Sequence, residues 1–338
     1  MEKGRVIGVC LGFLLAIPAV FIRLIVRFIS LGCGVFRVKT RTQPACLLDP
    51  ELGVHKYMSV NGIKIHYVEA GDSDKPLMLF VHGFPEFWFS WRHQIKHFKR
   101  NYRVVAMDTR GYNESDKPAG IDEYILKNLV EDVKGLVEGL GVSKFTLVAH
   151  DWGGAIAWNV AAIYPEMVEN LIICNLPHVL ALEDAQKSSW SQMLKSWYMV
   201  FFQCPVLPEL FTLMEDIKIM NGNMKDAKEE EKEVLEAYKY AFRDYTTWNR
   251  GINYYRALVT NKGLEFAKSI KGRLSSIEVR TLHIFGTGDK HLGLESAQAS
   301  AKYVKNYQLE LLEGVSHWVQ QEAPQQVNAL MDTFLQKS

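Results

Sequence analysis

Short apolar runs alternate along the chain with segments in which apolar residues recur at helical spacing. The apolar runs, which are typical of strands buried on both faces of a sheet, are Leu77–Val81, Tyr102–Met107, Phe145–Ala149, Asn170–Cys174, Arg280–Phe285 and Gln308–Leu312. The helical segments are Glu123–Leu140, Ala155–Tyr164 and Gln325–Leu335. Strands and helices that alternate through short links predict a parallel, doubly wound α/β sheet flanked by helices.

Two parts of the soluble chain depart from this alternation. His55–Val60 and Ile63–Glu69 predict a β-hairpin that turns at Asn61-Gly62. From about residue 177 to residue 276 the sequence is helix-like and rich in aromatic residues and methionine, which predicts a helical insertion over the sheet edge where such folds bind ligands. We therefore expect a core made of residues 46–176 and 277–338 and a helical cap made of residues 177–276.

The N-terminal segment is strongly apolar. Val6–Ile22 contains no charged residue, and a helix of about 20 apolar residues spans a bilayer. Residues 1–45 are therefore predicted to form a transmembrane anchor and linker, with a cleaved signal peptide as the alternative. Lysine and arginine are more numerous after the segment than before it, which predicts that the large domain lies in the cytosol. With its N-terminal helix among lipids, the chain is expected to be a single-pass membrane protein of the endoplasmic reticulum.

Composition and charge narrow the possible classes of protein. The 338 residues are 48% hydrophobic and 23% charged, which excludes a disordered chain. The 39 basic and 38 acidic residues leave no excess charge to neutralise phosphates, so nucleic acid is not expected as the main partner. The five cysteines are scattered, and no metal-ligand spacing is present, so neither a metal nor a disulfide framework is expected.

Asp151 occupies a sharp turn between a strand and a helix. The run Phe145–Ala149 leads into His150-Asp151-Trp152-Gly153-Gly154, and a helical segment follows. Small residues on both sides of Asp151 let the backbone turn tightly and present the central side chain at the top of the sheet. Esterases carry a serine nucleophile at this position. An aspartate that caps the following helix is the structural alternative.

A carboxylate at this position constrains the chemistry. A serine that opened an epoxide would form an ether, which the enzyme could not cleave. A carboxylate that attacks a saturated carbon forms an alkyl ester, which water can hydrolyse. Asp151 therefore points to electrophilic saturated carbons, as found in epoxides or alkyl halides.

The remaining parts of a hydrolytic site follow in order along the chain. His317, on a loop after the final strand, is the candidate base that activates water, and Asp289, after the preceding strand, would orient it. The backbone N–H groups of Phe84 and Trp152 are candidates for the oxyanion hole of ester hydrolysis. A surface-loop histidine and a turn aspartate are the alternatives for His317 and Asp289.

Several separated motifs resemble those of one enzyme family. They are His82-Gly83-Phe84-Pro85-Glu86 with Ser90-Trp91-Arg92, Asp108-Thr109-Arg110-Gly111-Tyr112, and His150-Asp151-Trp152-Gly153-Gly154. Together they resemble α/β-hydrolase-fold epoxide hydrolases from about Lys56 to the C-terminus, and the apolar N-terminus resembles the membrane-anchored epoxide hydrolase 3 and 4 branch. The resemblance implies an α/β-hydrolase fold with a helical cap. One departure is Asn113, where the family usually has glycine; asparagine tolerates a left-handed backbone, so we expect the turn to survive.

The resemblance also implies two cap tyrosines that hydrogen-bond the epoxide oxygen. Tyr198 matches the first and Tyr255 the second, with Tyr254 as an adjacent competitor. Trp152, Tyr254 and Pro85 are expected to contact substrate. A tyrosine packed in the cap is the structural alternative for each phenol.

The sequence thus predicts an epoxide hydrolase that needs no cofactor. Asp151 would form an ester with a small apolar or lipid epoxide, and water activated by His317 would release a vicinal diol. Two alternatives stay open: a haloalkane dehalogenase, in which Trp152 would help to bind the halide, and a hydrolase-fold protein that binds ligands without catalysis.

Overall fold

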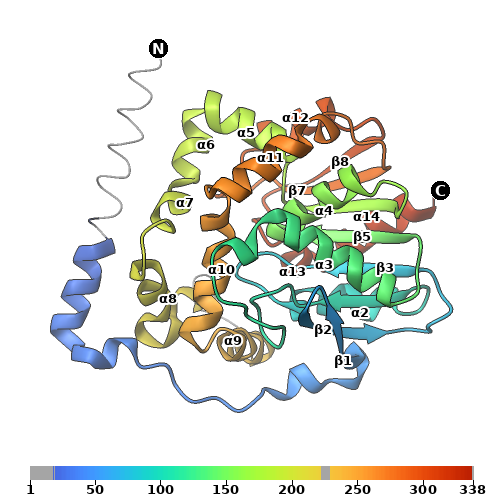
Figure 1. Cartoon of the computed structure of the whole chain (residues 1–338). Coiled ribbons are helices and arrows are strands. Elements are labelled where there is room, and N and C mark those ends of the chain that lie inside the picture. The colour runs from blue at the N-terminus through green and yellow to red at the C-terminus, as the bar shows by residue number, and fades with distance from the viewer. Residues whose placement is uncertain (1–17, 19, 222–228, 337–338) are drawn as a thin grey trace.

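The computed structural model describes residue 18 and residues 20–221 and 229–336 (Figure 1). The eight strands are β1 (Val54–Val60), β2 (Ile63–Ala70), β3 (Leu77–Val81), β4 (Arg103–Met107), β5 (Phe145–His150), β6 (Val168–Cys174), β7 (Thr281–Gly286) and β8 (Tyr307–Leu312). They form one sheet in the order β1-β2-β4-β3-β5-β6-β7-β8. β2 pairs antiparallel with β1 and β4, and all other neighbours are parallel.

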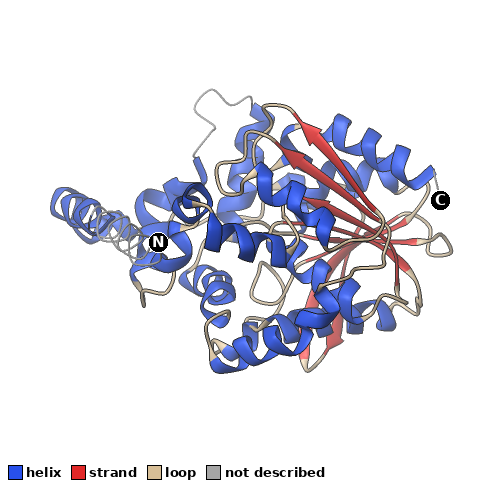
Figure 2. Cartoon of the chain, turned by 90° about the horizontal axis from the view of Figure 1, so that it is seen from above, coloured by secondary structure: helices blue, strands red, loops and turns tan. Residues whose placement is uncertain are grey.

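Helices cover both faces of this sheet (Figure 2). The α-helices that follow β1 outside the insertion are, among the described residues, α2 (Arg92–Phe98), α3 (Leu126–Gly139), α4 (Trp152–Ile163), α12 (Leu294–Ala299), α13 (Val319–Glu322) and α14 (Pro324–Gln336). Because β3 and β5 lie in the middle of the sheet, every residue of both strands is buried. The predicted strands agree with the observed ones to within two residues at each end, and the mostly parallel sheet flanked by helices is confirmed.

Seven α-helices lie between β6 and β7 in the part of the chain that the structure describes. They are α5 (Val179–Ser188), α6 (Trp190–Lys195), α7 (Trp197–Phe201), α8 (Leu207–Ile217), α9 (Glu229–Ala241), α10 (Tyr245–Ala257) and α11 (Asn261–Leu274). In Figure 1, α6 to α10 gather at one end of the sheet. They fall within the segment predicted to be a cap, and the division of the chain into core and cap at residues 177 and 276 stays a prediction.

The segment before β1 connects the insertion to the core. The Arg41 guanidinium makes a bidentate ion pair with Asp216 of α8, with N–O distances of 2.8 and 2.6 Å. Further along the segment, Asp49 pairs with Lys96 of α2 at 2.7 Å. Residues 37–52 therefore form a strap between the two parts of the molecule.

The predicted transmembrane anchor is not confirmed by the structure. Within the part of the chain that the structure describes, no helix has the length and apolar character needed to cross a bilayer. The described helical residues 20–31 contain Arg23 and Arg27, and Arg27 pairs with Glu215 of α8. Most of the predicted span Val6–Ile22 lies outside the described residues. The single-pass membrane localisation in the endoplasmic reticulum and the lipid partner, both of which depended on this anchor, are not supported.

Candidate active site

Asp151 lies at the tight turn between β5 and α4. Its backbone adopts φ 48° and ψ −120°, a conformation that costs an L-residue about 1–3 kcal/mol and that surrounding structure must enforce. A Cβ on Gly153 would lie 2.2 Å from the carbonyl oxygen of Val81, and a Cβ on Gly83 would lie 2.5 Å from the Cβ of Asp151. The glycines are therefore required because backbone and carboxylate approach each other so closely.

The Asp151 carboxylate has one partner for each oxygen. Oδ1 accepts a hydrogen bond of 2.8 Å from the backbone N–H of Phe84, and Oδ2 lies 3.5 Å from Nε2 of His317. The residue is 8% exposed. Of the two backbone groups predicted for an oxyanion hole, Phe84 thus contacts the carboxylate directly, and Trp152 supplies the first residue of α4.

His317 is held by a second carboxylate on its far side. Its Nδ1 lies 2.7 Å from Oδ2 of Asp289, and both residues are buried. Asp289 follows β7, and His317 follows β8, so the ends of adjacent parallel strands bring the two residues together. The structure therefore places Asp151, His317 and Asp289 in one line, although 138 and 28 residues separate them along the chain.

The charges of this line are interdependent. Burial opposes the charge on His317, but Asp289 and Asp151 outweigh it and raise the pKa of the imidazole to about 10. Burial likewise disfavours both carboxylates, but His317 holds their pKa values below the ordinary value. Before any reaction, the arrangement near neutral pH is an imidazolium between two carboxylates.

Two tyrosines of the insertion face each other near this line. The rings of Tyr198 (α7) and Tyr255 (α10) pack edge to face with centroids 5.8 Å apart. Burial, and then the negative charge of Asp151, raise the pKa of both phenols, so both keep their protons near neutral pH. They are therefore suited to donate hydrogen bonds.

The other residues predicted to contact substrate have different surroundings. Tyr254 donates its hydroxyl to the carbonyl of Arg110 at 2.7 Å, so this phenol is already engaged, which favours Tyr255 as the second donor. The Trp152 ring packs edge to face on Tyr255 with centroids 5.0 Å apart. Pro85 is partly buried next to Phe84.

The structure reveals supporting residues to which sequence analysis assigned no role. Nδ1 of His150 lies 2.6 Å from Oε2 of Glu86, and Nε2 of His150 lies 2.9 Å from the carbonyl oxygen of His317. Asn175 donates to Oδ2 of Asp289 at 2.8 Å. Glu86 and His150 lie within the motifs quoted above. Asn175 directly follows β6, and this position at the end of a strand was the signal in the sequence that could have indicated its role.

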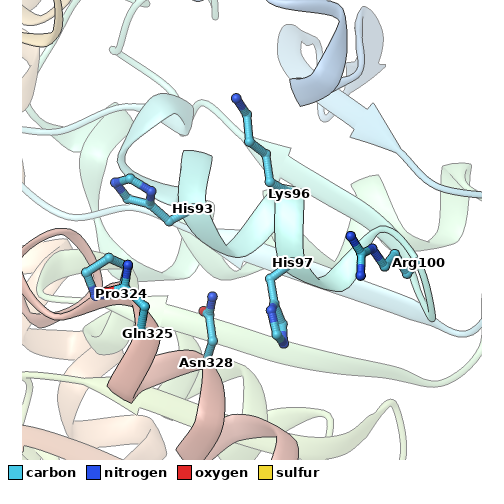
Figure 3. A pocket seen from close by; sticks show the side chains of 7 residues that line it. All are labelled: His93, Lys96, His97, Arg100, Pro324, Gln325 and Asn328. Atoms are coloured by element: carbon cyan, nitrogen blue, oxygen red, sulfur yellow. The ribbon is translucent and has the colours of Figure 1, made fainter. Parts of the chain in front are cut away.

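No metal centre is seen among the described residues. No group of three or more His, Cys, Asp or Glu side chains among them is arranged to hold an ion. A separate pocket of about 300 Å³ lies between α2 and α14, lined by His93, Lys96, His97, Arg100, Pro324, Gln325 and Asn328 (Figure 3). Lys96 and His97 already pair with Asp49 and Asp332, so we assign no chemistry to this pocket.

Comparison with known proteins identifies the class of the fold and then the group within it. The sequence pattern of the alpha/beta hydrolase fold matches residues 76–324. The chain is 41% identical over 322 residues to epoxide hydrolase 1 of Caenorhabditis elegans, covering 93% of this chain and 77% of the relative. It is 41% identical over 323 residues to human epoxide hydrolase 4, covering 91% and 87% of the two chains.

Solved structures give the same result. A Bacillus megaterium epoxide hydrolase in complex with an inhibitor matches with a TM-score of 0.73 and 32% identity, covering 83% of this chain and 100% of that chain. The chain therefore belongs to the α/β-hydrolase-fold epoxide hydrolases. This result confirms the predicted family and agrees with the epoxide rather than the haloalkane alternative.

Proposed function

We propose that this chain hydrolyses apolar epoxides to vicinal diols through an ester formed on Asp151. The supporting observation is the placement of an ionised carboxylate between the Phe84 N–H and His317, near the two protonated phenols. In the first step, Asp151 attacks one epoxide carbon and the carbon–oxygen bond of the ring breaks. Tyr198 and Tyr255 stabilise the leaving oxygen, and one of them gives it a proton.

Ester formation prepares the second step. When Asp151 becomes an ester, His317 loses one of the two negative charges that stabilise its proton, so its pKa falls. The proton released replaces the one that the phenol gave to the alkoxide. Neutral His317, oriented by Asp289, then takes a proton from water, and the hydroxide attacks the ester carbonyl.

The backbone donors act in this second step. The N–H of Phe84, already bonded to Oδ1 of Asp151, is suited to stabilise the oxyanion that forms when hydroxide adds to the ester. The N–H of Trp152 is the second donor in this proposal. Collapse of the tetrahedral intermediate releases the diol and restores the carboxylate, with one carboxylate oxygen now derived from water.

Aromatic residues around the site favour an apolar substrate. The Phe84 ring packs edge to face on Phe202 and Tyr255 with centroid distances of 5.5 and 5.4 Å. Phe202 and Tyr255 are themselves 4.9 Å apart. Such a wall offers dispersion and burial of hydrocarbon rather than hydrogen bonds, so epoxides on aliphatic or aromatic chains, including lipid epoxides, fit it best.

A single-turnover reaction in ¹⁸O-labelled water tests the covalent route. With enzyme in excess over a styrene-type or long-chain epoxide, the first diol should carry unlabelled oxygen from Asp151. Solvent oxygen in that first product would show direct attack by water. Asp151→Ala should abolish turnover while the protein stays folded; tight epoxide binding by the wild type without diol would instead indicate a non-catalytic protein.

A further inference from the structure

The loop that carries Asp289 is hydrogen-bonded to the insertion by one glutamine. Gln192 of α6 donates from Nε2 to the carbonyl of His291 at 3.0 Å and accepts through Oε1 from the N–H of Gly293 at 2.8 Å. Gln192 is 3% exposed, so neither bond competes with bulk water. One side-chain amide thereby satisfies two backbone groups of residues 289–293, which we call the acid loop.

A lysine on the next turn of α6 holds the same loop. The Lys195 ammonium donates to the carbonyls of Asp289 and Leu292, both at 3.0 Å. The insertion thus fixes four backbone groups of the acid loop through two side chains. A charged donor makes each of these two bonds stronger than a neutral one would be.

The backbone of the acid loop also orients the Asp289 carboxylate. Oδ1 of Asp289 accepts from the N–H groups of His291 and Leu292 at 2.7 and 2.9 Å, and Oδ2 faces His317. A shift of the loop backbone therefore rotates the carboxylate relative to the imidazole. The position of α6 is transmitted to His317 through this loop.

The side chain of His291 connects the two halves of the site. Its ring packs edge to face on His317, with centroids 5.2 Å apart, and on Tyr198, with centroids 5.8 Å apart. Burial, and then the charge of His317, lower the pKa of His291, so the ring is neutral near neutral pH. It separates the base from the cap phenol without adding charge between them.

We propose that Gln192 and Lys195, acting through the acid loop and His291, form a latch that fixes α6–α7 and Tyr198 relative to the Asp289–His317 pair. They are positioning residues, because they reach the reacting groups only through the acid loop. The inference rests on the function proposed above and adds a specific demand: the latch supports ester hydrolysis, which depends on His317, more than ester formation, which depends on Asp151.

The test separates the two chemical steps in latch variants and matched controls. Gln192→Ala and Lys195→Met are compared with Ser269→Ala and Lys271→Met, whose side chains also lie in the insertion but do not contact the acid loop. Rapid-quench single turnovers give the rates of ester formation and ester decay. We expect ester decay to slow about tenfold or more in both latch variants, with ester formation changed less than threefold and both controls unchanged.

The pH dependence of kcat distinguishes loss of the latch from a general loosening of the fold, which would not shift it. A carboxylate no longer aligned with His317 stabilises the imidazolium less, so the pKa of His317 falls. The acid limb of kcat should therefore shift to lower pH in Gln192→Ala. Gln192→Glu keeps the acceptor for the Gly293 N–H and loses the donor to His291, so it should recover part of the decay rate.

The outcomes distinguish the latch from the function on which it rests. If wild-type enzyme accumulates no ester at all, the covalent function fails. If ester forms but decays in the latch variants at the control rates, with the acid limb unmoved, the latch is refuted. If Gln192→Ala does not fold, Gln192→Glu and Lys195→Met decide: wild-type decay rates in both refute the latch, and slowed decay with intact ester formation supports it.

Discussion

Removing the negative charge of Asp151 should lower the pKa of His317 by several units. The carboxylate oxygen lies 3.5 Å from Nε2, and two unit charges at that distance interact by about 5 kcal/mol at an effective dielectric constant of 20. This energy corresponds to roughly three and a half pKa units. Asp151→Asn, which keeps the shape and removes the charge, should thus bring the imidazole from its pKa of about 10 close to neutrality.

Heteronuclear NMR titration of histidine-labelled protein measures this shift. The His317 resonance is assigned among the ten histidines by its absence in His317→Gln, and wild type and Asp151→Asn are titrated from about pH 5 to pH 10.5. Asp289→Asn serves as a second perturbation and should lower the same pKa from the other side of the ring. If His317 titrates within one unit of the wild-type value in Asp151→Asn, ester formation cannot be what converts the imidazole to a base.

Three further predictions concern stability. The pKa of His317 is raised from an ordinary 6.5 to about 10, so the stability that this residue adds to the fold is complete below about pH 6.5 and is lost as pH rises towards 10. The Tm of the wild type should therefore fall over this range relative to the Tm of His317→Gln. Parallel profiles of Tm against pH would contradict this prediction. Gly153→Ala should lower the free energy of unfolding, measured in urea, by more than about 2 kcal/mol and abolish activity. Gly272→Ala, in open space on α11, should leave that free energy unchanged or raise it by up to about 1 kcal/mol. Arg41→Ala, which removes a 6%-exposed side chain from the strap, should lower the free energy of unfolding by about 1–3 kcal/mol. Lys75→Ala, the surface control, should lower it by at most about 1 kcal/mol. Equal losses in the two variants would show that the strap does not stabilise the fold.

The local elements were predictable because they depend on short-range patterns. Asn61 and Gly62 both adopt positive φ, as a two-residue hairpin turn requires, and Asn113 takes φ 40° at the position where the family has glycine. The helix α2 was not predicted, because its seven residues are too few to establish a helical period. The transmembrane anchor stays a prediction, because most of its apolar run lies outside the described residues.

The sequence by itself determined the chemistry of the nucleophile and the order of the strands and helices. A carboxylate between small residues at a strand–helix turn implies ester formation on carbon, and alternating apolar runs imply a parallel sheet, because both depend on neighbours in the chain. Only the tertiary structure decided which distant groups meet: Asn175 and α6 on the acid loop, Glu86 beneath His150, and the engagement of Tyr254 by Arg110. These contacts join residues that are far apart along the chain. The side chains of the insertion reach the site because the insertion packs against the strand ends, and no local sequence pattern encodes that packing.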